Sequence, residues 1–213
     1  MIYFLAYPAM FAVMRLLMRV LGRLHSTGEF HVPRRGGVLY CPNHRSDCDP
    51  VAIFVSAPRR CWMLGKSELF DIPRLGWFFA HFQAFPIKRD SPDRAALRRA
   101  ESLLKSGEAL LLFPEGRLSE DGLLQNIQSG AALLSLRTGA PIIPIGLQNT
   151  DKIVPYGATR PFYSRAPVSV AYGPRINPRT YAALPRGEAL SAITSKLREE
   201  LLRLSGQPLP PAS

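Results

Sequence analysis

A histidine and an aspartate five residues apart, His44 and Asp49, are the pair of side chains best suited to chemistry in this sequence. The unperturbed pKa of histidine lies near neutrality, so His44 can take a proton from a substrate hydroxyl. A carboxylate that reaches the second ring nitrogen fixes the tautomer and orientation of the imidazole. The spacing favours a general base, although a lone loop histidine can also be filler and an aspartate before proline can simply cap a helix.

The segments around this pair predict its position in the fold. Residues 38–40 form a β-branched and aromatic apolar run, which is typical of a buried strand. Asp49 and Pro50 match an N-cap followed by proline at the first helical position, and the apolar residues 51–55 continue that helix. His44 is therefore predicted on a strand-to-helix loop, where α/β folds carry their functional residues.

The composition indicates one basic domain. The chain has 213 residues, 46% of them hydrophobic, which is enough for a single domain with a substantial core. Its net charge is +11, and only five of its 27 basic residues are lysine. Arginine binds phosphate and carboxylate through a planar fork of donors. We expect a polyanionic partner, either nucleic acid, anionic lipid or a phosphorylated substrate.

The three cysteines, Cys41, Cys48 and Cys61, include no C-x-x-C pair. Their odd number and apolar neighbours predict reduced, partly buried thiols in the cytosol. Cys41, His44 and Cys48 are close enough in sequence to suggest zinc, but no fourth ligand has a suitable spacing. We therefore expect no metal site.

Residues 1–14 carry no charge, and Arg15, Arg19 and Arg23 follow at four-residue spacing. As a helix, the uncharged stretch would span about 21 Å, against about 30 Å for a bilayer core. A secretory signal has its positive region first, whereas this order is reversed. The pattern favours an interfacial or re-entrant anchor with its arginines at the headgroups. A buried helix with a solvated arginine face and a tilted transmembrane helix are the alternatives.

The rest of the chain alternates between predicted strands and predicted helices. Strands are predicted at residues 60–64, 84–87, 109–113, 141–147 and 167–172, and helices at 91–105, 129–136 and 188–204. Pro144 predicts an edge position, a bulge or a strand end for the fourth of these strands. Two short helical pieces are predicted in residues 65–82, whose aromatic cluster (Trp77, Phe78, Phe79 and Phe82) suits either the core or an acyl-chain groove. Residues 149–166 are predicted to be irregular.

Four blocks in this order give the sequence a clear resemblance to the lysophosphatidic acid acyltransferase family, the 1-acylglycerol-3-phosphate O-acyltransferases and related glycerolipid enzymes. The family's H-x4-D block matches His44 to Asp49, and its F-P-E-G block matches Phe113 to Gly116. Its other two blocks match Lys66, Glu68, Leu69, Pro73, Gly76 and Arg89, and the proline-containing apolar strand at residues 141–145. The resemblance covers roughly residues 24–175.

The resemblance implies an O-acyltransferase of phospholipid biosynthesis that moves an acyl group from acyl-CoA or acyl carrier protein to the hydroxyl of lysophosphatidate. His44 would be the general base and Asp49 its partner, with no cofactor and no acyl-enzyme. Lys66, Arg89 and Arg117 would bind the acceptor's phosphate. Glu115 would order that cluster or bind the glycerol part. Backbone N–H groups near Gly116 are candidates to stabilise the oxyanion.

The resemblance also implies a domain organisation and a location. We expect a membrane-associating helical segment at residues 1–24, an acyltransferase domain at 25–204 and a disordered tail at 205–213. The domain is expected to be α/β, with a mixed, mostly parallel central sheet flanked by helices. The protein would act at the cytoplasmic face of the membrane as a peripheral or monotopic enzyme, with no nucleic acid as partner.

One departure from the family pattern leaves the acceptor open. The commonest third block is F-P-E-G-T-R-S, whereas here Arg117 stands one position earlier and Leu118 follows it. The acceptor could therefore be another lysolipid, of the lysophosphatidylethanolamine or lyso-aminolipid type. A serine hydrolase is disfavoured because the chain has no G-x-S-x-G. A non-catalytic anionic-lipid-binding protein is the alternative from another class.

Overall fold

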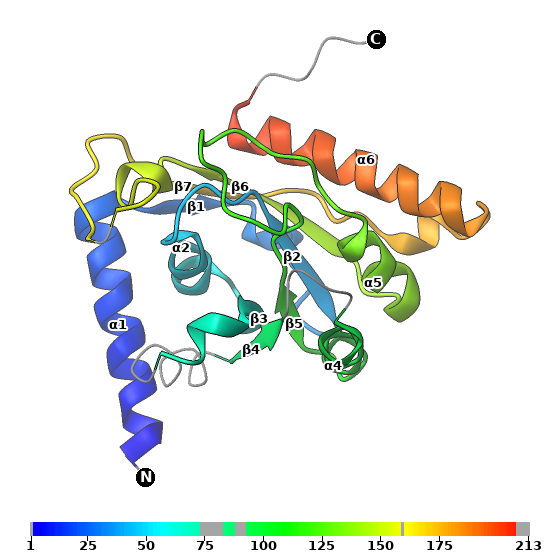
Figure 1. Ribbon diagram of the computed structural model, residues 1–213, viewed down its shortest axis with the longest axis horizontal. Helices are drawn as coiled ribbons and strands as arrows, with labels where there is room; N and C mark the ends of the chain where they lie inside the picture. Colours follow the sequence, from blue (N-terminus) through cyan, green and yellow to red (C-terminus); the bar gives the residue numbers. More distant parts are fainter. Residues whose placement is uncertain (1, 73–82, 88–92, 159, 208–213) are drawn as a thin grey trace.

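A computed structural model describes residues 2–72, 83–87, 93–158 and 160–207. Its central feature is a seven-stranded sheet with helices on both faces (Figure 1). The strands are β1 (His25–Thr27), β2 (Val38–Pro42), β3 (Cys61–Lys66), β4 (Ala84–Ile87), β5 (Ala109–Leu111), β6 (Ile142–Gln148) and β7 (Ser169–Tyr172). The α-helices are α1 (Ile2–Gly22), α2 (Asp49–Ser56), α4 (Arg94–Lys105), α5 (Gly130–Thr138) and α6 (Arg186–Ser205).

The strand order β1-β7-β6-β2-β5-β3-β4 gives a mixed, mostly parallel sheet. Neighbours are parallel except β6 and β7, which are antiparallel. Strands β2 to β6 therefore run in one direction, and their carboxyl ends meet at one edge of the sheet. The predicted fold class, a single α/β domain with such a sheet between helices, is confirmed.

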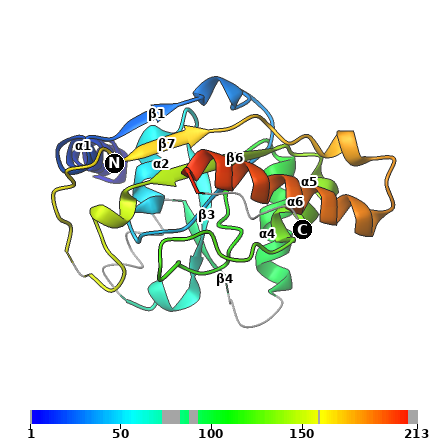
Figure 2. The ribbon, with the colours of Figure 1, turned by 90° about the horizontal axis from the view of Figure 1, so that it is seen from above.

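Side chains alternate between two apolar layers. Along β2, Val38 and Tyr40 pack into the layer under α1 and α2, whereas Leu39 and Cys41 pack into the layer under α4, α5 and α6. Figure 2 shows the same arrangement from above, with α1 at the end of the molecule far from the start of α6. β2 is buried on both faces, as expected for a continuous apolar run in a parallel sheet.

Two sequence expectations about these elements are wrong in detail. β6 is not an edge strand, because it pairs with β2 on one side and β7 on the other. The ladder with β7 begins at Ile145, one residue after Pro144, so the missing proline N–H falls outside that ladder. Helix α2 begins at Asp49 with Cys48 as its N-cap, so Asp49 is the first helical residue and not the cap.

Helix α1 packs against the domain along one face. Phe11 meets Phe54 of α2 edge-to-face at 5.7 Å, and Met18 is buried in the core. The opposite face carries Val13, Leu16, Leu17 and Val20, which are all exposed. In the part of the chain that the structure describes, no helix combines the length and hydrophobicity needed to cross a bilayer.

Candidate functional site

Three of the parallel strands lead to described candidate residues at the same edge of the sheet. β2 leads into residues 43–49, which we call the His44 loop, and β5 leads into residues 114–119, which we call the Glu115 turn. Lys66 is the last residue of β3, in register with Ile87 of β4. Arg89 and the predicted aromatic cluster (Trp77, Phe78, Phe79 and Phe82) lie outside the described residues.

His44 and Asp49 form the hydrogen bond that their spacing predicts. The Nδ1 atom of His44 lies 2.9 Å from Oδ2 of Asp49, and both residues are buried. The ring of Phe113 stacks on the imidazole with centroids 3.9 Å apart and an angle of 24° between the planes. A proton on Nδ1 shared with the carboxylate leaves Nε2 as the nitrogen that can accept a proton from a substrate.

Asp49 holds the loop as well as the imidazole. Its Oδ2 atom also accepts hydrogen bonds from the backbone N–H groups of Arg45 at 2.6 Å and Ser46 at 2.8 Å. The carboxylate stands at the N-terminus of α2, where the helix dipole favours negative charge. Three donors therefore fix the position of the carboxylate oxygen that orients His44.

Glu115 is a clamp on the His44 loop. Its Oε1 atom accepts from the His44 backbone N–H at 2.6 Å, and its Oε2 atom accepts from the Gln125 backbone N–H at 2.8 Å. Burial raises the pKa of this carboxyl, and the two backbone N–H groups oppose that rise. Each oxygen already accepts a backbone hydrogen bond, so Glu115 orders the His44 loop, whereas the sequence had predicted that it orders the cationic cluster or binds the glycerol part of a substrate.

Gly116 and Arg117 complete the Glu115 turn. Gly116 has a φ of +72°, which lies in the left-handed region that favours glycine. Its N–H donates to the carbonyl of Phe113 at 3.1 Å, so among the backbone N–H groups near Gly116 that were predicted as oxyanion candidates, this one closes the turn. Arg117 follows with an exposed side chain at the surface of the turn.

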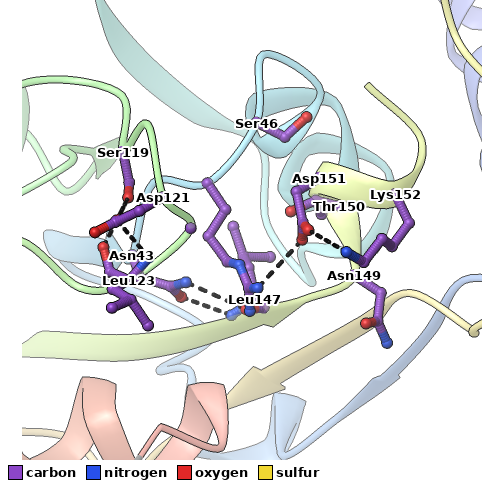
Figure 3. Close-up of polar contacts among 12 residues, drawn as sticks. Asn43, Ser46, Ser119, Asp121, Leu123, Leu147, Asn149, Thr150, Asp151 and Lys152 are labelled. Atoms are coloured by element: carbon purple, nitrogen blue, oxygen red, sulfur yellow. Dashed lines mark hydrogen bonds and ion pairs between the residues drawn. The ribbon is translucent and has the colours of Figure 1, made fainter. Parts of the chain in front are cut away.

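Asn43 ties the loop to β6 in a way that sequence reasoning missed. Its side-chain amide donates to the carbonyl of Leu147 at 3.2 Å, and its Oδ1 accepts from the Leu147 N–H at 2.7 Å, as Figure 3 shows. Beyond the end of β2, the side-chain amide of Asn43 thus makes the pair of hydrogen bonds to β6 that a backbone residue would make. The sequence gives no local signal for this pairing, because the two residues are 104 positions apart.

A polar pocket of about 310 Å³ lies beside the His44 loop. Its lining includes Arg45, Ser119, Asp121, Asp151 and Tyr156. The Arg45 guanidinium lies 3.3 Å from the Asp151 carboxylate, and Asp121 accepts hydrogen bonds from the Ser119 hydroxyl at 2.9 Å and the Leu123 N–H at 2.9 Å (Figure 3). None of these five residues was predicted, because the pocket forms only when three distant loops meet.

A second pocket is mainly apolar and lies on the opposite face of the sheet. Its volume is about 250 Å³, and Leu64, Leu97, Leu112 and Leu134 are among the residues that line it. Leu112 immediately precedes Phe113, the residue that stacks on His44. The end of β5 therefore touches both the apolar pocket and the imidazole.

The cysteines are buried, as expected. Burial raises the pKa of the Cys48 thiol to about 12 and that of Cys61 to about 12. Cys48 donates through Sγ to the carbonyl of Thr150 at 3.3 Å. Among the described residues, no three His, Cys, Asp or Glu side chains are grouped so that they could hold a metal ion.

Comparisons with known proteins show which family this sequence matches. A family model described as Acyltransferase matches residues 23–148. The chloroplastic 1-acyl-sn-glycerol-3-phosphate acyltransferase BAT2 of Brassica napus is 34% identical over 122 residues, which are 56% of this chain and 35% of the relative. The 1-acyl-sn-glycerol-3-phosphate acyltransferase of Bacillus subtilis is 24% identical over 196 residues, 91% of this chain and 94% of the relative.

The fold also has a solved counterpart. The crystal structure of the 1-acyl-sn-glycerophosphate (LPA) acyltransferase PlsC from Thermotoga maritima superposes with a TM-score of 0.68 at 20% identity, covering 89% of this chain and 79% of the other. This chain spans about a third of the length of the plant relatives. Since the family model covers more than half of the sequence, including the His44 loop and the Glu115 turn, the chain belongs to the acyltransferase family.

Proposed function

We propose that this protein is an O-acyltransferase that moves a fatty acyl group from a thioester donor to the hydroxyl of 1-acylglycerol-3-phosphate. The observation that carries this proposal is the buried hydrogen bond between His44 and Asp49, within a chain of the acyltransferase family. Relatives with matching sequence are named as 1-acyl-sn-glycerol-3-phosphate acyltransferases, which supports lysophosphatidate as the acceptor.

The proposed reaction needs only proton transfer and positioning from the protein. Nε2 of His44 takes the proton of the acceptor hydroxyl as that oxygen attacks the thioester carbonyl. The tetrahedral intermediate then collapses, the carbon–sulfur bond breaks, and the imidazolium returns the proton to the departing thiolate. Asp49 stabilises the imidazolium without being protonated itself.

The two ends of the substrates have different candidate sites. Arg117, Lys66 and Arg89 remain the proposed ligands of the acceptor's phosphate. The apolar pocket beside Leu112 is a candidate for the acyl chain, because it adjoins the strand end that supports His44. Filling it by Leu134→Phe should shift the preferred donor towards shorter acyl chains, and an unchanged chain-length profile would exclude this pocket.

An activity panel tests the proposal. Purified protein should transfer label from acyl-CoA or acyl carrier protein to lysophosphatidate, and His44→Ala should lower the rate by about 10² to 10⁴. Lysophosphatidylethanolamine and lyso-aminolipid belong in the panel because Arg117 precedes Leu118 in place of the commoner order. Failure of all acceptors with both donors would contradict the proposal. Vesicle binding without transfer would favour a lipid-binding protein.

We further propose that the enzyme works at the cytoplasmic face of the membrane through α1. The support is the exposed apolar face formed by Val13, Leu16, Leu17 and Val20, with the exposed Arg15 and Arg19 beside it. Deleting α1 would uncover the core around Met18, so substitutions are the better test. Leu16→Ser with Val20→Ser should move the protein from the membrane fraction to the supernatant, whereas an unchanged distribution would contradict the anchor.

A further inference from the structure

Residues 160–165 present exposed aromatic and basic side chains next to α1. Phe162 is 53% exposed and Tyr163 is 60% exposed. Arg160 and Arg165 on either side are exposed as well. The Ser164 N–H donates to the carbonyl of Leu21 at 2.8 Å, so this segment lies against the last turn of α1, as Figures 1 and 2 both show.

The two neighbouring segments have the same unusual composition. Neither residues 11–24 nor residues 152–168 contain an aspartate or glutamate. Together they expose aliphatic side chains on α1, aromatic side chains on the 160–165 segment and arginines on both. Aromatic rings with one polar end prefer the membrane interface, and arginines beside them attract anionic headgroups. The surface therefore has the chemistry of an anionic bilayer contact.

The segment is also connected to the His44 loop. The Ser46 hydroxyl donates to the carbonyl of Val154 at 2.7 Å, and the Phe162 N–H donates to the carbonyl of Ile153 at 2.8 Å. Residues 153–165 thus hydrogen-bond the loop at one end and α1 at the other. The Ser46 N–H in turn donates to Asp49, which holds His44, so hydrogen bonds link residues 160–165 to the candidate general base.

We propose that residues 160–165 form a second membrane contact that, together with α1, holds the His44 loop at an anionic lipid surface. This inference rests on the proposed membrane location and adds a specific site to it. α1 supplies aliphatic burial, whereas the 160–165 segment supplies interfacial aromatic side chains and charge. Two contacts fix the orientation of the domain, which a single helix lying in the interface does not.

Co-sedimentation with vesicles tests the second contact. The probes are vesicles of phosphatidylcholine alone and of phosphatidylcholine mixed with phosphatidylglycerol. Arg160→Gln with Arg165→Gln should weaken binding to the mixed vesicles by about fivefold for each arginine. Phe162→Ser with Tyr163→Ser should weaken binding to both kinds by about tenfold. Arg179→Gln with Arg186→Gln is the matched control, because these exposed arginines belong to segments far from α1 and their loss should have little effect.

A fluorescence measurement keeps the test independent of folding defects. The emission of a polarity-sensitive dye attached to the Tyr163→Cys variant should shift to the blue when mixed vesicles are added. The three native cysteines are buried, so the dye labels position 163. Aromatic and arginine variants that bind vesicles like the wild type, with no dye shift, would overturn the second contact alone. Wild-type protein that binds no vesicles would overturn the membrane location as well. A dimer in solution that the aromatic substitutions dissociate, with vesicle binding unchanged, would assign this surface to a second copy and overturn the inference.

Discussion

The His44 loop and Arg117 lie at the same edge of the sheet, but the loop is buried and fixed whereas the arginine side chain is exposed. The loop is buried and is fixed by Asp49, Glu115 and the pairing of Asn43 with β6. Arg117 is exposed on the surface of the Glu115 turn. The difference suggests that the position of the proton acceptor is preorganised, whereas the group proposed to bind the acceptor can adapt to its ligand.

The contrast between the two regions fails if the Asp49 carboxylate can be removed from the His44 loop without a fall in kcat. Asp49→Ala should lower kcat by about 10² to 10⁴, because no carboxylate then orients the imidazole or stabilises the imidazolium. The backbone N–H groups of Arg45 and Ser46 would also lose their acceptor, which should cost about 1–3 kcal/mol of unfolding free energy. Steady-state kinetics and urea titration measure both effects, and a kcat within a few-fold of wild type would exclude the proposed role of Asp49.

A milder test removes one of the two backbone hydrogen bonds that Glu115 accepts. Glu115→Gln keeps one acceptor oxygen but turns a donor towards either the His44 or the Gln125 N–H. We expect about a tenfold fall in kcat, little change in KM and a loss of about 1–2 kcal/mol in stability. A large rise in KM at constant kcat would show instead that Glu115 binds the substrate.

The opposite kinetic pattern is expected for the exposed arginine. Arg117→Ala should raise KM for lysophosphatidate by about tenfold through loss of a charge-assisted hydrogen bond, with kcat nearly unchanged. Arg117→Lys should restore only part of the lost affinity for lysophosphatidate, because lysine lacks the planar guanidinium with its paired donors. Arg179→Ala serves as a control, because this arginine is also exposed but belongs to the separate short helix at Pro178–Tyr181. A fall in kcat for Arg117→Ala at constant KM would break the distinction between the two regions.

The smallest effect is expected at Asp121. Hydrogen bonds from the Leu123 N–H and the Ser119 hydroxyl lower the pKa of its carboxyl. A depressed folded-state pKa adds stability above the unfolded pKa of about 4, and this contribution disappears as the pH falls through the folded value. Asp121→Asn should therefore lower the melting temperature slightly at pH 7 and not at all in strong acid. An equal difference at both pH values would show that the charge is not responsible.

Sequence reasoning succeeded where interactions are local. The hydrogen bond between His44 and Asp49 joins residues five apart, so their spacing within a strand–loop–helix unit was sufficient to predict it. The helix start at Asp93, whose side chain accepts from Ala95 and Ala96, followed from the same kind of local pattern. These features depend on a few neighbouring residues and on the geometry of helix ends.

Long-range partners could not be predicted in this way. Glu115 meets His44, 71 residues away, and Asn43 meets Leu147, 104 residues away, and no pattern in one sequence indicates these backbone partners. Strand β1 was missed because His25–Thr27 is short and polar, and it is stabilised by parallel pairing with β7. Pro144 left an edge position, a bulge and a strand end as alternatives, because the local rule does not indicate where the β7 ladder starts.

The contacts that shape the His44 loop are largely made to main-chain atoms, among them the N–H groups of residues 44, 45 and 46 and both polar groups of Leu147. Peptide groups are present whatever side chain is attached to them. The exposed Asp47 and the pocket-lining Arg45 can therefore be exchanged in evolution or in the laboratory while the imidazole keeps its place. Under the proposed function, a loop of this kind allows acceptor preference to change during evolution while the general base keeps its position.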